Sequence, residues 1–242
     1  MKRSIDRSHA IIARCGVVAC ALVLALAGCG NQADRAMERA KAHRAKGDNA
    51  SAAIEVKNAL AAQPKNPALF LFAGQVMSDL GDLVNAEHSL RRALEHGHPA
   101  AEVLPLLGRV LLELEKYPEA LEALRGDLKS DAAIAPQVAV LRGRAYLAQG
   151  AFTEARTEFR VSLGARPTVG AQLGLAQVAM AENDRATAER LVAEVLGADP
   201  KNVEALMVQA EFLRLGGRLD DAAAAYRQAI KLEPENFAAS VG

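Results

Sequence analysis

A pattern of residues recurs along this chain at a nearly constant spacing of 34 residues. The clearest copies are GDNASAAIEVKNALAAQPKN at 47–66, GDLVNAEHSLRRALEHGHPA at 81–100 and GRLDDAAAAYRQAIKLEPEN at 217–236. One alanine recurs in six copies, with steps of 34, 34, 35, 33 and 34 residues, at Ala52, Ala86, Ala120, Ala155, Ala188 and Ala222. Because one unit of this size cannot bury its apolar face alone, the period predicts an array in which neighbouring copies stack.

The composition favours helices inside each copy, since the chain is rich in Ala, Leu and Glu and only 4% aromatic. A 34-residue helix-turn-helix repeat of this kind resembles the tetratricopeptide (TPR) family. The resemblance implies an all-α fold, a right-handed α-solenoid of about six TPR helix-turn-helix repeats across residues 33–236.

The resemblance also assigns packing roles to particular places in each repeat. Small residues at the eighth place would let the two helices of a pair approach closely, and they are Ala40, Gly74, Gly108, Gly143, Ala176 and Ala210. Large residues at the eleventh place would fill the space between pairs, as Met77, Leu111, Tyr146 and Leu213. Those at the twenty-fourth place would do the same, as Val56, Leu90, Leu124, Phe159, Val192 and Tyr226.

The repeats are expected at approximately 33–66, 67–100, 101–134, 136–168, 169–202 and 203–236. We expect the third and fifth copies to depart most from the pattern, with the largest irregularity near residue 130, where RGDLKSDAAIAP replaces the regular turn. Residues 237–242 resemble the truncated start of a further repeat or a tail. Since no polar capping helix follows, we expect either that the chain is a short version of a longer array or that a partner, or a second copy, covers the apolar face of 219–232.

The first 28 residues resemble the signal peptide of a bacterial lipoprotein. A basic start precedes residues 15–28, which carry no charge and are fewer than the roughly 20 apolar residues that a membrane-spanning helix needs. The ending Leu26-Ala27-Gly28-Cys29 resembles a lipobox, which implies cleavage before Cys29, a lipid on Cys29 and a short tether at 29–32. Gly30 then favours the outer membrane, at its periplasmic face. An ordinary secretory signal with an incidental cysteine is the alternative.

Cleavage at this point would remove Cys15 and Cys20 and leave no free thiol for a disulfide, a metal or catalysis. It would also remove more basic than acidic residues, and a weakly acidic chain offers no electrostatic case for nucleic acid. The sequence contains no phosphate-binding loop, nucleophile elbow or metal-ligand quartet. We therefore expect no enzyme, no metal and no cofactor other than the covalent lipid on Cys29. The run His96-Gly97-His98 is better explained as a helix end than as a metal site.

A candidate binding surface follows from the fifth, ninth and twelfth places of each first helix, which share one helix face, and its residues are named from the fifth and ninth places. The array would present this face on its concave side, with a basic middle formed by Arg109 and Arg144. We predict that it binds an extended partner segment with an acidic or polar group on the arginines, and a solvated helix face is the alternative. The candidate residues are Met37, Lys41, Leu71, Gln75, Pro105, Arg109, Val140, Arg144, Leu173, Gln177, Met207 and Glu211.

Residues 29–125 resemble the repeat lipoproteins of the PEP-CTERM/exosortase system (the PrsT family), through the lipobox, the AIEVKNAL helix and the junction RRALEHGHPAAEVLPLLGRVL at 91–111. The resemblance implies a non-enzymatic scaffold for exopolysaccharide export or surface protein sorting. One alternative is a pilotin-like assembly factor for a type IV pilus or secretion pore. Another is a glycan-binding protein, which the few aromatic residues disfavour. The expected partners are proteins of an envelope export or sorting machine, with the lipid anchor in the membrane.

Overall fold

The computed structural model describes residues 32–125 and 133–234 of the chain. The chain divides into two compact units, unit 1 (Met1–Val110) and unit 2 (Leu111–Gly242), each with its own packed core. Cys29 and the predicted signal peptide lie outside the described residues, as does the centre of the expected irregularity near residue 130.

Every regular element in these two ranges is an α-helix, which confirms the predicted all-α repeat fold. None of the described helices is long and apolar enough to cross a membrane. Unit 1 contains a helix at 32–44, α2 (Asn49–Ala62), α3 (Pro67–Asp79) and α4 (Leu83–Glu95), and α5 (Ala100–Glu113) crosses the boundary between the units. Unit 2 continues with α6 (Tyr117–Ala123), α7 (Ala135–Ala148), α8 (Phe152–Ala165), α9 (Val169–Ala181), α10 (Arg185–Ala198), α11 (Val203–Leu215) and α12 (Leu219–Leu232).

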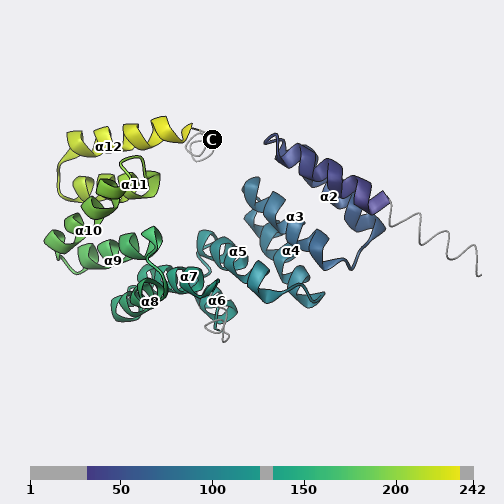
Figure 1. Cartoon of the computed structure of the whole chain (residues 1–242), viewed down its shortest axis with the longest axis horizontal. Helices are drawn as coiled ribbons and strands as arrows, with labels where there is room; N and C mark the ends of the chain where they lie inside the picture. Colours follow the sequence, from purple (N-terminus) through teal and green to yellow (C-terminus); the bar gives the residue numbers. More distant parts are fainter. Residues whose placement is uncertain (1–31, 126–132, 235–242) are drawn as a thin grey trace, which may run out of the picture. The chain divides into compact units, whose positions relative to one another are not determined.

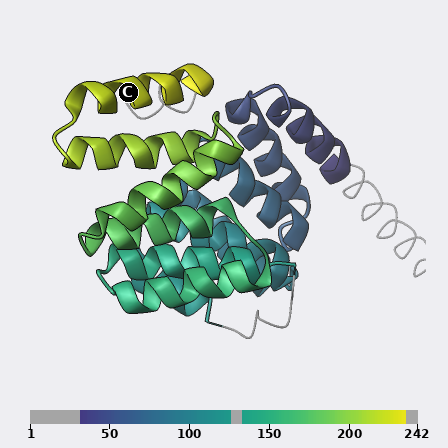
Figure 2. The same ribbon diagram turned by 60° about the vertical axis from the view of Figure 1, so that its left-hand side comes forward.

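The helices pack in sequential pairs, α3 with α4, α7 with α8, α9 with α10 and α11 with α12. Figures 1 and 2 show the last pair lying side by side in opposite directions. The second helices α2, α4, α8, α10 and α12 have 13 or 14 residues, whereas α6 has seven. The second helix of the third copy is thus the shortest among those described.

Glycine at the eighth place of a first helix lets the side chain of the paired helix rest on the backbone. A β-carbon at Gly74 in α3 would lie 2.6 Å from Leu90 Cδ2 in α4. A β-carbon at Gly143 in α7 would lie 2.6 Å from Phe159 Cε1 in α8. Carbon atoms do not approach so closely, so any side chain at either place would push the two helices apart. The predicted role of the eighth place is confirmed at both positions.

Residues at the twenty-fourth place form the centre of the packing. Leu90, Leu124 and Phe159 are fully buried, and Val56 and Val192 are nearly so. Burying an apolar side chain of this size stabilises the folded state by about 1.5–3 kcal/mol relative to leaving it exposed. The six recurring alanines are also buried. Close packing of the paired helices leaves little space there, which explains why the residue is small.

The turn between the two helices of each repeat requires one residue with a left-handed backbone, which explains why most repeats have a glycine there. Glycine supplies it at Gly47, Gly81, Gly150 and Gly217. The third and fifth copies instead place Glu115 (φ 58°) and Asn183 (φ 65°) there. A left-handed residue other than glycine costs roughly 1–2 kcal/mol, which asparagine offsets in part by local hydrogen bonding. These are the two copies that the sequence predicts to be the least regular.

We expect Gly143→Ala to lower the free energy of unfolding by about 1–3 kcal/mol, because the new methyl group overlaps the Phe159 ring. Gly164→Ala in α8 is the matched control, since no atom lies within 4 Å of a β-carbon built there. That control should stabilise the chain by about 0.5–1 kcal/mol through helix propensity. Urea unfolding followed by circular dichroism measures both. Two variants of equal stability would contradict the packing described at Gly143.

Candidate functional site

Ninth-place residues of the first helices line a cleft in each unit. The unit 1 cleft has a volume of about 300 Å³ and is lined by Arg44, Gln75, Ser78, Asp79, Glu102, Pro105, Leu106 and Arg109. The unit 2 cleft has a volume of about 450 Å³ and is lined by Arg144, Leu147, Ala148, Gln177, Glu204, Met207 and Val208. The structure thus brings together Gln75, Pro105 and Arg109 in one cleft, and Arg144, Gln177 and Met207 in the other.

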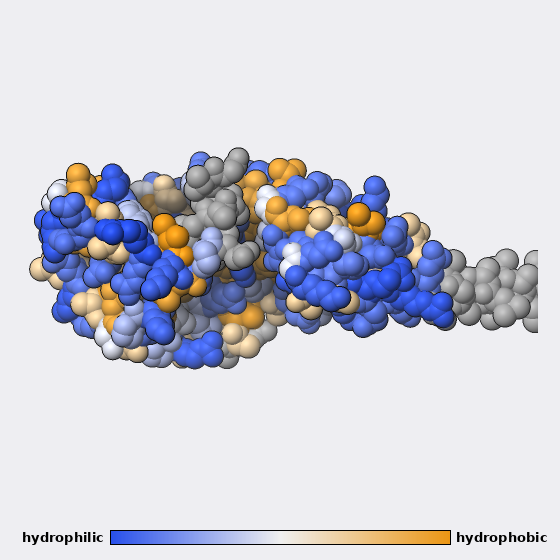
Figure 3. All heavy atoms as spheres, turned by 90° about the horizontal axis from the view of Figure 1, so that it is seen from above, coloured by the Kyte–Doolittle hydropathy of each residue, from blue (hydrophilic) through white to orange (hydrophobic). Residues whose placement is uncertain are grey.

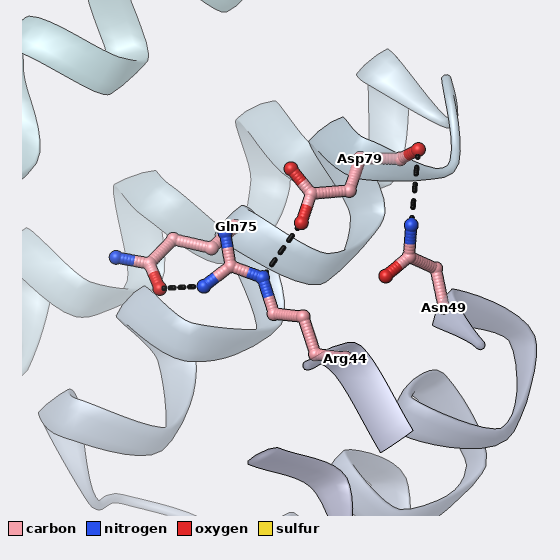
Figure 4. A network of polar contacts seen from close by, with 4 residues as sticks. All are labelled: Arg44, Asn49, Gln75 and Asp79. Carbon is pink, nitrogen blue, oxygen red and sulfur yellow. Dashed lines mark hydrogen bonds and ion pairs between the residues drawn. The ribbon is translucent and has the colours of Figure 1, made fainter. Parts of the chain in front are cut away.

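Arg44 organises the polar side of the unit 1 cleft (Figure 4). Its Nε donates to Asp79 Oδ2 at 2.6 Å, and its Nη1 donates to Gln75 Oε1 at 3.0 Å. Its guanidinium carbon also lies 5.7 Å from the centre of the Phe72 ring, within the range of a cation–π contact. Asn49 Nδ2 donates to the Asp79 carbonyl oxygen at 3.4 Å. Arg44 therefore joins the helix at 32–44 to α3 and is committed to internal contacts.

Arg109 and Gln75 are two groups of the unit 1 cleft with donors left for a partner. Gln75 uses its carbonyl oxygen for Arg44, and Figure 4 shows its amide nitrogen pointing away from that arginine. Arg109 is exposed, and no side chain in the described ranges forms an ion pair or hydrogen bond with it. The nearby carboxylate of Glu102 lies 2.9 Å from His98 Nε2. The cleft can therefore offer one guanidinium and one amide to acceptor groups.

The unit 2 cleft combines an ion pair with apolar walls. Arg144 on α7 donates through Nη2 to Glu204 Oε1 on α11, and Gln177 lies between them in sequence, on α9. Leu147, Met207 and Val208 supply apolar lining. Such a cleft can accept an apolar side chain beside a polar or charged group.

The structure corrects the predicted binding surface at two fifth-place positions. Leu173 is 1% exposed and belongs to the core cluster of α9, α10 and α11, and Leu71 is 9% exposed. Both side chains pack inward between helices, so neither offers surface to a partner. The fifth place contributes to the clefts only at Pro105 and Met207.

The remaining predicted residues have neighbours within their own unit. Met37 packs against two core clusters of unit 1, and Val140 packs against the cluster that contains Phe159. Lys41 Nζ lies 2.8 Å from Glu38 Oε1. These residues lie outside the two clefts.

Glu211 is held in a local network. It accepts two hydrogen bonds from Arg214, at 2.8 and 2.6 Å, and one from the Tyr226 hydroxyl at 3.1 Å. The Arg214 contact, aided by Tyr226, lowers the pKa of the Glu211 carboxyl. Partial burial and the carboxylate together raise the pKa of Tyr226. The network joins α11 to α12 and explains why Tyr226 replaces the aliphatic residues found at this place in most copies.

The two histidines at the end of α4 have separate neighbours. His96 stacks on the Phe70 ring with centres 5.2 Å apart, and Arg92 lies 4.7 Å from the centre of the same ring. His98 faces Glu102. Among the described residues, no group of three or more His, Cys, Asp or Glu side chains could hold a metal ion.

Several residues that line the two clefts were not predicted from the sequence, and Arg44 and Glu204 are two charged ones among them that form ion pairs. Arg44 stands at the twelfth place of its repeat and Glu204 at the second. The prediction put the twelfth place on the same helix face but named residues only at the fifth and ninth places, so Arg44 was not named. The pairing of Glu204 with Arg144, 60 residues apart, has no local sequence signal.

This arrangement of paired helices with clefts on the first helices defines a helical repeat protein, and family comparison identifies the repeat. The model of the tetratricopeptide repeat-like domain family matches residues 29–169, and a tetratricopeptide repeat model matches 173–239. The chain therefore belongs to the tetratricopeptide repeat-like domain family, whose repeats serve protein–protein interaction. No curated protein sequence matches the chain.

Solved structures of tetratricopeptide repeat proteins share the fold. A protein from Parabacteroides merdae is 21% identical with a TM-score of 0.67, covering 83% of this chain and 80% of that chain. PilW, described as a widely conserved type IV pilus biogenesis factor, is 20% identical with a TM-score of 0.66, covering 84% and 94% respectively. Pseudomonas aeruginosa pilF is 20% identical with a TM-score of 0.61, covering 86% and 95%. At these identities the likeness shows a common fold.

We expect Glu211→Gln to destabilise the fold at neutral pH but not at low pH. Because the folded-state pKa of Glu211 is lowered, its stabilising effect is present above the unfolded-state value and is lost as the pH falls through the folded-state value. The side chain is 43% exposed, so solvent screening limits the effect to about 1 kcal/mol or less. Urea midpoints of the variant and the parent chain at pH 7 and pH 3 measure it. A difference that persists unchanged at pH 3 would contradict the ionic origin.

Proposed function

We propose that this chain is a lipid-anchored periplasmic scaffold that binds protein segments of an envelope export or surface-sorting machine. The observation that carries the proposal is the pair of clefts on the first helices, each of which is lined by an arginine and a glutamine amide. An extended segment can place alternate side chains into such clefts while its acidic groups meet the guanidinium groups. The family match supports a protein partner, because this class of repeat mediates protein–protein interaction.

The anchor rests on the sequence at the start of the chain. The family model begins at residue 29, the position of the proposed lipidated cysteine, which supports a leader that ends just before the repeats. Several acyl chains on Cys29 would hold the scaffold at the membrane essentially permanently. The proposed location is the periplasmic face of the outer membrane, and the proposed pathway is exopolysaccharide export or exosortase-linked sorting.

A role in type IV pilus assembly is the second candidate. It is favoured by the likeness to PilW and to Pseudomonas aeruginosa pilF, since this chain matches nearly the whole of each. Both candidates use the chain in the same way, as a set of repeats that binds protein components at a membrane.

The buried aromatic residues argue against direct glycan binding. Sugar rings commonly need exposed aromatic faces, yet Phe70, Phe72 and Phe212 are 8% exposed and Phe159 is fully buried. Figure 3 shows a mostly hydrophilic face on which hydrophobic residues form small separate groups. The described surface thus favours a protein partner bound in the clefts.

We expect Cys29→Ala to leave the chain soluble or uncleaved, because the proposed lipid attachment site is gone. Cys20→Ala, within the proposed leader, is the matched control and should still reach the outer membrane. Membrane fractionation and metabolic labelling with a fatty acid measure both outcomes. A Cys29→Ala chain that still fractionates with the outer membrane would overturn the lipid anchor.

We expect Arg109→Glu to weaken capture of partner proteins without changing the thermal stability by more than a few degrees, because exposed substitutions typically change stability by only about 0.5 kcal/mol. Arg160→Glu on α8 is the control, since it makes the same charge change at an exposed site outside the clefts. Crosslinking in intact cells followed by mass spectrometry compares the two. Equal capture by both variants would remove the unit 1 cleft from the proposal.

The pathway is tested by deleting the gene and restoring it. Cell-surface polysaccharide, surface-sorted proteins and pili are quantified in the parent, deleted and restored strains. Loss and recovery of polysaccharide or surface proteins supports the first candidate, and loss and recovery of pili supports the second. No change in any of them would overturn both.

A further inference from the structure

The unit 2 cleft contains an ion pair between helices that are not sequential neighbours. Arg144 lies on α7 and Glu204 lies on α11, with the α9–α10 pair between them in sequence. Their side chains are 40% and 47% exposed, so the pair lies in water-accessible space on the cleft wall. Arg144 is also the only arginine in this cleft, among the residues that line it.

A glycine on α9 lies beside the Arg144 side chain. A β-carbon at Gly170 would lie 3.7 Å from Arg144 Nη2 and 3.2 Å from Val140 Cγ1. The equivalent second place in the other copies has a side chain in every case, as Asp34, Ala68, Glu102, Gln137 and Glu204. Arg144 thus lies beside the one second-place residue that has no side chain.

The surroundings of the ion pair suit a ligand that carries both a charged group and an apolar group. The Gln177 amide lines the same cleft, and no side chain in the described part of the chain forms a hydrogen bond with it. Leu147 and Met207 form apolar walls beside it. The contact with Glu204 shows that the Arg144 guanidinium can donate to a carboxylate at this position.

We propose that Glu204 competes internally for Arg144. An acidic side chain of an incoming protein segment displaces Glu204 from the guanidinium. The segment is an extended stretch of protein with Asp or Glu next to an aliphatic residue. Its carboxylate takes the place of Glu204 on Arg144, and its aliphatic side chain packs against Leu147 and Met207. The inference rests on the proposed function, because it assumes that the first-helix clefts bind protein segments.

The exchange is feasible because neither partner of the ion pair is deeply buried. Glu204 returns to water when it is released, so its charge is not left desolvated. The incoming carboxylate gains a charge-assisted hydrogen bond equivalent to the one that is lost, and the aliphatic contact is added to it. The competitor thus disfavours segments that carry only the acid, and selects those that carry both groups.

The test uses the lipidated full-length mature chain in detergent micelles. A phage-displayed library of random linear 12-residue peptides is selected on the parent chain, and the enriched peptides are synthesised and measured by fluorescence anisotropy. The inference expects Asp or Glu beside Leu, Ile, Val or Met in the enriched sequences. It also expects that replacing the peptide's acid by its amide weakens binding, and that higher salt does the same.

Two substitutions separate competition from a purely structural pair, since both remove the same ion pair. Glu204→Gln should raise peptide affinity by about twofold to fivefold, because it frees Arg144. Arg144→Gln should lower the affinity by about tenfold or more, because it removes the guanidinium that donates to the peptide carboxylate. Glu182→Gln, which breaks the ion pair with Arg156 outside the cleft, is the matched control and should leave the affinity unchanged.

Changes in the same direction for Glu204→Gln and Arg144→Gln would overturn the inference, since a structural tie predicts equal effects of losing either partner. Peptides that bind with no acidic preference, or independently of Arg144, would overturn it while leaving the proposed function standing. Failure of the parent chain and of Glu204→Gln to select any peptide would count against the proposed function as well.

Discussion

The close contact between a small residue of one helix and a large residue of its partner is the interaction on which each helix pair depends. Leu90 rests on Gly74, and Phe159 rests on Gly143. Such contact brings two helices near enough for recurring alanines to be buried between them. Phe159 also contacts Gly174 in the next first helix, so one side chain joins two successive pairs within unit 2.

This packing uses one side of each first helix and leaves another side for polar residues. The first helices are consequently where ion pairs and open clefts coexist, as at Arg44 in unit 1 and Arg144 in unit 2. The two arginines play different parts. Arg44 ties adjacent repeats together through Asp79 and Gln75, whereas Arg144 reaches a glutamate two repeats further along. A guanidinium held by two acceptors and an aromatic ring is a structural element, and one held by a single exposed carboxylate is available for exchange.

The predicted binding surface could be located by helix periodicity, but only approximately. Successive residues of an α-helix are separated by about 100°, so a place that lies at the edge of a face can point to solvent or into a helix contact. Met207 lies on the cleft side of that edge, and Leu173 lies on the core side. The crossing of neighbouring helices decides between these outcomes, and the local sequence does not encode it.

The sequence by itself determined the all-α repeat fold, because a 34-residue period with small residues at one fixed place specifies how each pair of helices packs. It also determined where the pattern would weaken, since Glu115 and Asn183 stand where a left-handed glycine is the unstrained choice. Only the tertiary structure decided which charged groups of the first helices are engaged. Arg109 is open, and Arg144 meets a carboxylate 60 residues away. The physical reason is that side-chain pairing between distant repeats depends on how the intervening helices stack, which the spacing of residues along one helix does not specify.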